Sequence, residues 1–182
     1  MNFKLVKLGD ISSITKLAGF EFSKYIKYND LGDIIALRAL NLKNGRLILN
    51  EVQRIDKETS DKLPRSKLFK NEIVLTYTGN GYGDAAFIKE NDKYHLAPNI
   101  AKITPNNTTY PLFLFEFIKS DLFRKQLRNF VTGSSQPTIP MRTLRKLFVP
   151  FPNYNIQSKI GYILNLLDKK IELNIKLNQN LI

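Results

Sequence analysis

The residues from Thr78 to Asp84 include three glycines at alternate positions, and glycine-rich loops can hold a phosphate on their backbone amides. A Walker loop would need Gly-Lys-Ser or Gly-Lys-Thr after its glycines, and neither follows here. A dinucleotide-binding loop would lead directly into a helix, whereas residues 85–88 (Ala-Ala-Phe-Ile) are typical of a strand. Two interpretations stay open: a hairpin with left-handed residues, or a DNA-facing loop in which Tyr82 and backbone amides approach the duplex.

A second group of polar side chains surrounds the Asn44-Gly45 pair, which is a strong signal for a tight turn. Arginine makes paired hydrogen bonds to guanine, and asparagine makes them to adenine. The group could therefore read bases, or it could be ordinary solvated charge. It consists of Arg38, Asn41, Lys43 and Arg46.

Enzyme signatures are missing from the sequence. The single histidine, His95, cannot form a zinc site with a second imidazole, and there is no cysteine. No Gly-x-Ser-x-Gly motif occurs, and the only acidic-x-Lys triplet, Asp168-Lys169-Lys170, lies in a predicted helix. An adenine methyltransferase would carry a Pro-Pro-aromatic loop, and no Pro-Pro pair exists. These observations favour a protein that reads nucleic acid over one that reacts with it.

The charge balance points the same way. The chain has 28 Lys and Arg against 16 Asp and Glu, a formal charge of +12. Residues 151–182 contain four Lys and two acidic residues, so +2 lies there and +10 lies in residues 1–150. A basic globular part is typical of a nucleic-acid surface, although a solvated surface without a partner is the alternative. The sequence has neither a signal peptide's apolar stretch nor eighteen consecutive apolar residues, so we expect a cytoplasmic protein with no membrane partner.

The elements that must position these residues follow from apolar spacing. We expect strands at 34–37, 47–49, 72–77, 85–88, 100–103 and 147–149, and a helix over 112–128. Short strands with few helices predict an α+β fold with a curved or barrel-like sheet. We expect two parts, a globular domain at 1–150 and a long C-terminal coiled-coil helix at 151–182.

The predicted C-terminal helix has a wide apolar stripe. One row alternates by four and three, the a/d rhythm of a coiled coil, and consists of Ile160, Leu164, Leu167, Ile171, Asn174, Asn178 and Leu181. A second row lies on an adjoining face and consists of Ile163, Leu166, Leu173 and Leu177. We infer that part of this helix packs on its own domain and part on another helix. The alternative is an ordinary surface helix.

Several segments, in this order and spacing, resemble the DNA-specificity subunit of type I restriction–modification systems. They are Leu-Gly-Asp-Ile at 8–11, Leu-Arg-Ala-Leu-Asn-Leu-Lys-Asn-Gly at 37–45, 73–76 running into Gly79 and Gly83, 96–100, Gly-Ser-Ser-Gln at 133–136, 148–152, 157–160, and 167–171 with Asn174. Members of this family typically carry two recognition domains and two paired helices. This chain has one of each, so the resemblance predicts a half-subunit or a truncated piece.

The resemblance implies an adaptor that catalyses nothing itself and binds no cofactor. It would read one half of a bipartite target on double-stranded DNA and dock methyltransferase subunits. Those subunits would bind S-adenosylmethionine and would link this chain to the restriction subunit. A homodimer through the C-terminal helix is expected. Our candidates for DNA contact are Arg38, Asn41, Lys43, Arg46, Thr76, Thr78, Asn80, Tyr82, Ser134, Ser135 and Gln136. The alternatives are a freestanding DNA-binding regulator without a methyltransferase partner and, ranked lower, a nuclease of unrecognised type.

Overall fold

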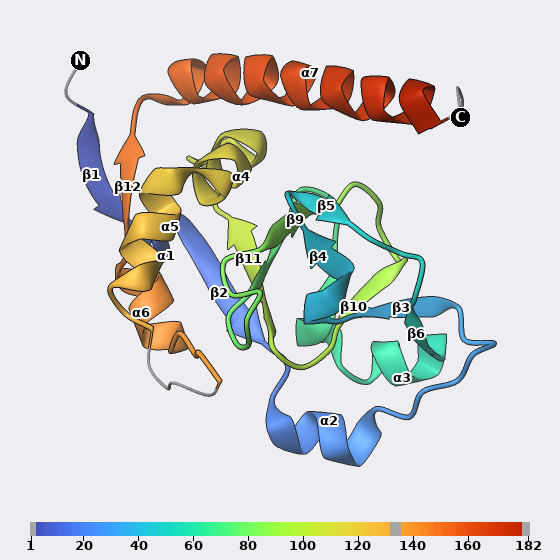
Figure 1. The fold of residues 1–182 in the computed structure, drawn as a ribbon. Helices are drawn as coiled ribbons and strands as arrows, with labels where there is room; N and C mark the ends of the chain where they lie inside the picture. The colour runs from blue at the N-terminus through green and yellow to red at the C-terminus, as the bar shows by residue number, and fades with distance from the viewer. Residues whose placement is uncertain (1–2, 132–135, 180–182) are drawn as a thin grey trace.

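The computed structural model describes residues 3–131 and 136–179 (Figure 1). The strands are β1 (Lys4–Lys7), β2 (Ser12–Lys16), β3 (Ile34–Leu37), β4 (Leu42–Lys43), β5 (Arg46–Leu47), β6 (Gln53–Ile55), β7 (Lys67–Leu68), β8 (Ile73–Thr76), β9 (Ala85–Phe87), β10 (Tyr94–Leu96), β11 (Ile100–Pro105) and β12 (Phe148–Phe151). The helices are α1 (Leu8–Ile11), α2 (Gly19–Tyr25), α3 (Lys57–Asp61), α4 (Pro111–Lys119), α5 (Asp121–Arg128), α6 (Met141–Lys146) and α7 (Tyr154–Gln179), with 3-10 turns at Ala39–Asn41 and Pro64–Ser66.

The described strands form four separate sheets. One four-stranded sheet has the antiparallel order β2-β11-β8-β9, and the other has the order β6-β3-β10-β7, in which only β3 and β10 run parallel. The pairs β1-β12 and β4-β5 complete the set. The predicted α+β class is confirmed, but the predicted barrel-like closure is not found. Each four-stranded sheet keeps two open edges, β2 and β9 in one and β6 and β7 in the other, so neither closes on itself.

The central strands are buried on both faces. In β8, Ile73 and Leu75 belong to one apolar cluster and Val74 to another, because successive side chains point to opposite faces of a sheet. The first cluster is covered by α4 and α5, which contribute the fully buried Leu114, Phe123 and Leu127. The second cluster fills the space between the two four-stranded sheets. This packing fixes β8 and β9, and therefore the loop that joins them.

The single helix predicted over 112–128 is two helices, α4 and α5, and that prediction was wrong in this detail. Ser120 has extended backbone angles and ends α4, and its Oγ accepts a hydrogen bond of 3.3 Å from the Phe123 amide at the start of α5. Serine followed by an acidic residue in the first turn is an ordinary N-cap signal. The break turns α5 so that it lies beside the β8–β9 loop (Figure 1).

The predicted C-terminal helix is present as α7, and it crosses the outside of α4 (Figure 1). Asn153 caps it, because its Oδ1 accepts a hydrogen bond of 3.0 Å from the Ile156 amide. The helix runs for 26 residues, or about 39 Å at the usual rise per residue. No helix in residues 3–131 and 136–179 is long and apolar enough to cross a membrane.

Candidate nucleic-acid interface

The loop between β8 and β9 has the hairpin form considered for residues 78–84. The Gly83 amide donates to the Thr76 carbonyl at 2.9 Å, and the Tyr82 amide donates to the Gly79 carbonyl at 3.0 Å. Gly79 and Gly83 have φ angles of +95° and +87°, in the left-handed region that favours glycine. The two glycines therefore fold the loop so that Asn80 and Tyr82 stand at its tip.

The segment after the undescribed residues 132–135 lies directly beside this loop. The Gly79 amide donates to the Pro137 carbonyl at 2.8 Å, and the Ile139 amide donates to the Tyr77 carbonyl at 2.9 Å. The Thr138 and Thr78 hydroxyls are 3.4 Å apart and hydrogen bonded. Gln136 is exposed at the start of this segment. The structure thus brings Thr78, Asn80, Tyr82 and Gln136 together, whereas Ser134 and Ser135 lie outside the described residues.

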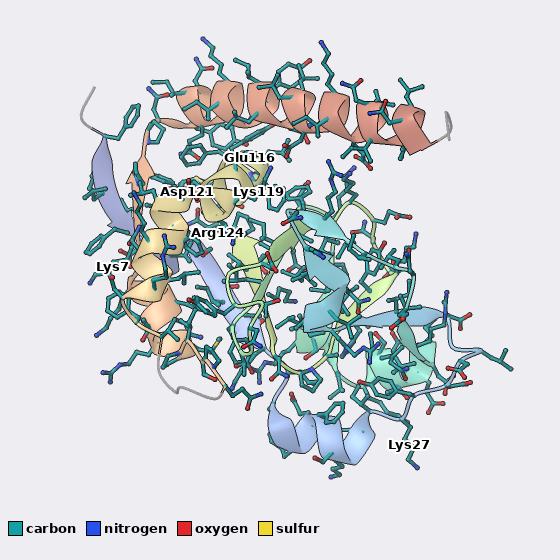
Figure 2. The ribbon with its side chains drawn as sticks, viewed as in Figure 1. Lys7, Lys27, Glu116, Lys119, Asp121 and Arg124 are labelled. Carbon is teal, nitrogen blue, oxygen red and sulfur yellow. The ribbon has the colours of Figure 1, made fainter. Side chains whose placement is uncertain are left out.

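Helix α5 adds two arginines to this surface that were not among the predicted DNA contacts. Arg124 projects from α5 (Figure 2) and donates from Nη2 to Asp84 Oδ1 at 3.3 Å. Arg124 and Arg128, with Leu127, Asn80 and Tyr82, line a surface pocket of about 200 Å³. Arg124 falls within the helix predicted over 112–128, but spacing along one helix could not reveal that it meets a loop forty residues away.

Thr76 is a correction to the predicted DNA contacts. Its side chain is fully buried in β8, opposite Ile100 of β11, and therefore cannot reach a DNA duplex. Thr78, two residues further on, is nearly buried, with 8% of its surface exposed. The tip of the loop, from Gly79 to Tyr82, is exposed or half-exposed.

Asn41 is the second correction. It is fully buried, and its side chain makes three hydrogen bonds within the chain. Oδ1 accepts from the Arg38 amide at 3.0 Å, and Nδ2 donates to the carbonyls of Ile48 at 2.9 Å and Glu51 at 2.8 Å. An amide whose donors and acceptor are used in this way has nothing left for an adenine edge. Asn41 therefore holds the β4-β5 hairpin together.

The other predicted DNA contacts around that hairpin, Arg38, Lys43 and Arg46, are not among the residues that line the pocket at the β8–β9 loop. Lys43 is exposed, and Arg46 lines a second pocket, of about 250 Å³, together with Asp168 and Glu172 of α7. Arg38 is half-buried close to Tyr28, where burial raises the pKa of the tyrosine hydroxyl and the arginine charge partly offsets that rise. The structure therefore groups Arg46 with α7 and the 77–83 loop with α5.

Helix α7 is fixed to the domain at its first two turns. Gln157 is fully buried; its Oε1 accepts from the Tyr110 amide at 2.9 Å, and its Nε2 donates to the Pro152 carbonyl at 2.9 Å and the Thr108 carbonyl at 3.3 Å. One turn later, Gly161 touches the start of α4 so closely that an added Cβ would lie 2.6 Å from the Phe113 amide nitrogen. A side chain cannot fit there, so the glycine is a packing requirement.

Further along α7, polar residues face the domain. Lys119 of α4 donates to Glu116 Oε2 at 2.9 Å and pairs with Asp168 of α7 (Figure 2 shows the two α4 side chains below α7). Burial raises the pKa of the Glu116 carboxyl, and the adjacent ammonium of Lys119 opposes that rise. Lys89 lies 4.0 Å from Glu172 and makes a second link.

The apolar side of α7 faces away from the domain. Leu167 and Ile171 of the predicted a/d row are 53% and 52% exposed, and Leu164 is 38% exposed. The adjoining row is also exposed, and consists of Ile163, Leu166, Leu173 and Leu177. Asn174 and Asn178 are exposed, and Leu181 lies outside the described residues. Ile160, predicted in the same row, instead packs partly against the domain's own core.

His95 is buried, with Nδ1 2.8 Å from the Leu96 carbonyl oxygen, and burial lowers the pKa of the imidazole. It is therefore neutral at pH 7. In the part of the chain that the structure describes, no three His, Cys, Asp or Glu side chains gather in a way that could hold a metal ion.

Comparison with known proteins gives one family match. The family model described as "Type I restriction modification DNA specificity domain" matches residues 1–181. Curated relatives include the EcoBI specificity subunit of Escherichia coli, which is 28% identical over an alignment of 134 positions that covers 72% of this chain and 28% of the relative. The HindI specificity subunit of Haemophilus influenzae is 25% identical over an alignment of 184 positions that covers 99% of this chain and 38% of the relative. The chain thus spans well under half the length of these two relatives.

Solved structures share the fold. The S subunit of a type I restriction–modification system from M. genitalium superposes with a TM-score of 0.64 at 15% identity, covering 94% of this chain and 40% of that one. The HsdS subunit from Thermoanaerobacter tengcongensis superposes with a TM-score of 0.61 at 11% identity, covering 94% of this chain and 38% of that one. These identities are low, so the likeness concerns the fold alone.

Proposed function

We propose that this chain, which belongs to the type I restriction–modification DNA specificity family, recognises one half of a split target on double-stranded DNA and catalyses no reaction itself. The observation that carries this proposal is the match of the family model over residues 1–181, which spans both the sheet domain and α7. The relatives named above are specificity subunits of type I restriction enzymes. The formal charge of +12 is what attraction to a phosphate backbone requires.

In this proposal residues 1–150 read DNA and residues 151–182 connect the reader to its partners. The reading surface is the tip of the β8–β9 loop with the segment that begins at Gln136. Its support is the exposure of Asn80 and Gln136 and the half-exposed ring of Tyr82, which gather on one surface beside two arginines. Other candidates for DNA contact are Arg38, Lys43, Arg46, Ser134 and Ser135. Asn41 and Thr76 are no longer candidates, because both are buried.

The second part of the proposal concerns α7. Its outward apolar rows would pack on another helix as a coiled coil, in a second copy of the chain or in a second half-subunit, with Asn174 and Asn178 setting the register. Two copies related by a two-fold axis would carry identical readers, so the target would be an inverted repeat with an uncontacted spacer. The methyltransferase subunits would dock on the same assembly and hold S-adenosylmethionine. They would also connect the assembly to the restriction subunit.

The experiment that tests the function is selection of bound sequences from a library of random DNA duplexes with the purified chain, at moderate salt. We expect enrichment of a motif with two inverted half-sites separated by a gap of fixed length. Absence of any enriched motif, with DNA binding of equal strength for all sequences, would contradict recognition by this chain. Co-purification of a methyltransferase with the tagged chain from its own host would support the adaptor role over a freestanding regulator.

A further inference from the structure

We propose that the pocket between the β8–β9 loop and α5 binds a single phosphodiester group of the DNA backbone. The pocket is lined by Asn80, Tyr82, Arg124, Leu127 and Arg128. The inference rests on the proposed function, because it names the chemical group that this part of the reading surface would take. It assigns a positioning role to α5, which the sequence motifs did not single out.

The pocket is built by a close approach of loop and helix. Gly83 has a φ of +87°, and a Cβ added there would lie 3.1 Å from Leu127 Cδ1. The glycine therefore lets the loop lie against α5, and the fully buried Leu127 forms the apolar floor. Arg124 and Arg128 are four residues apart on α5 and project from the same face. Asn80 and Tyr82 form the opposite wall.

The charge of the pocket matches a phosphodiester. Arg124 is held by its ion pair with Asp84, which fixes the guanidinium at the pocket wall while leaving other N–H donors available. Arg128 is exposed, and within residues 3–131 and 136–179 it makes no ion pair. Two arginines and one aspartate sum to +1, and a backbone phosphodiester carries a charge of −1.

The donor groups suit phosphate oxygens as well. Arginine binds phosphate through paired N–H donors, and the amide of Asn80 and the hydroxyl of Tyr82 can add hydrogen bonds. Among the described residues, the backbone amides of Asn80 and Gly81 make no backbone hydrogen bond, so the loop tip can contribute donors too. Phosphate contacts position a protein on the duplex, whereas base contacts specify sequence. A phosphate held here would fix how far the loop tip and Gln136 reach toward the bases.

The test compares Arg128→Gln with Lys125→Gln in the full chain. Both residues are exposed cations on α5, but Lys125 does not line the pocket. We expect Arg128→Gln to weaken binding about tenfold, by the same factor for the selected target and for a scrambled duplex. The slope of log Kd against log salt should fall by about one, and the selected motif should not change. Lys125→Gln should leave the affinity nearly unchanged.

Methylphosphonate substitution, which neutralises one backbone phosphate at a time, locates the contact. Among the positions at which the substitution weakens binding to the wild-type chain, one in each half-site should cost nothing further in Arg128→Gln. Equal losses of affinity for the Arg128 and Lys125 variants, a changed motif, or a further loss in Arg128→Gln at every phosphate that matters in the wild-type complex would each overturn the pocket assignment. A wild-type chain that binds no DNA would instead overturn the proposed function.

Discussion

Helices α5 and α7 both lie on the outside of the domain, but they are turned in opposite ways. In α5 the apolar Phe123 and Leu127 are buried in the core, and the charged residues point outward. In α7, after its first two turns, Asp168 and Glu172 face the domain, and the apolar residues point outward. Folding of the single chain therefore buries the apolar side of α5. It leaves the apolar side of α7 exposed to solvent.

The difference separates two kinds of surface. Full burial of a side chain such as Leu or Ile contributes about 1.5–3 kcal/mol of stabilising free energy. Burial of the exposed rows of α7 against a partner would therefore release a large amount of free energy. Contiguous apolar surface of this kind fits the protein interface that we propose for α7. The surface around α5 is polar and cationic, as DNA contact requires. On this view one helix belongs to recognition of DNA, and the other to assembly.

The largest difference in the free energy of unfolding should appear when one apolar side chain is truncated in each helix and the two variants are compared. Phe123→Ala removes a fully buried ring and should lower the free energy of unfolding by about 3–5 kcal/mol. Leu167→Ala changes an exposed side chain and should alter it by no more than about 0.5 kcal/mol in a dilute, monomeric sample. Urea unfolding followed by circular dichroism measures both. A loss for Leu167→Ala as large as that for Phe123→Ala would mean that α7 buries its apolar side on its own domain.

A smaller effect should come from the point where α7 is fixed. Gly161→Leu places a side chain where even a Cβ would lie 2.6 Å from the Phe113 amide nitrogen, and should cost about 1–3 kcal/mol by forcing α7 away from α4. Hydrogen exchange should then speed up in α7 while the β8 and β11 amides stay protected. Gly19→Leu is the matched control, because Gly19 is exposed and a Cβ added there meets nothing within 4 Å. Unchanged exchange in the Gly161 variant would show that α7 is not held at this point.

The smallest effect concerns the ionic link between α4 and α7. The pKa of Glu116 is raised above its ordinary value of 4.5 by burial, so the folded chain binds this proton more tightly than the unfolded chain. Stability must therefore fall as pH rises from about 4.5 toward the folded-state pKa. Glu116→Gln keeps the shape of the side chain and should flatten this part of the pH dependence, as measured by urea unfolding at several pH values. An identical pH profile in the variant would contradict a raised pKa at Glu116.

The elements with strong periodicity were predictable from the sequence. The cap at Asn153 and the outward rows of α7 follow from local signals, as does the left-handed loop around Gly79 and Gly83. The break at Ser120 was missed because the apolar pattern continues across it, although the serine itself was a usable signal. Periodicity reports which face of a segment is buried, but it cannot report a change in direction between two segments.

The candidate site was only partly predictable, for a different reason. Asparagine is chemically suited both to an adenine edge and to holding a hairpin, and only burial distinguishes the two roles for Asn41. Arg124 and Arg128 meet the loop through tertiary packing between residues forty or more positions apart. Residue type thus indicated the class of ligand, and the fold was needed to select the residues.

The most direct test of this account is sedimentation equilibrium of the chain at micromolar concentrations, beside the Leu164→Asp, Leu167→Asp double variant. Two charges in the outward apolar row should disrupt helix pairing without unfolding the domain, because both side chains are exposed in the single chain. We predict a dimer for the wild-type chain and a folded monomer for the variant. A wild-type chain that stays monomeric at high concentration would contradict the claim that α7 pairs with a second copy.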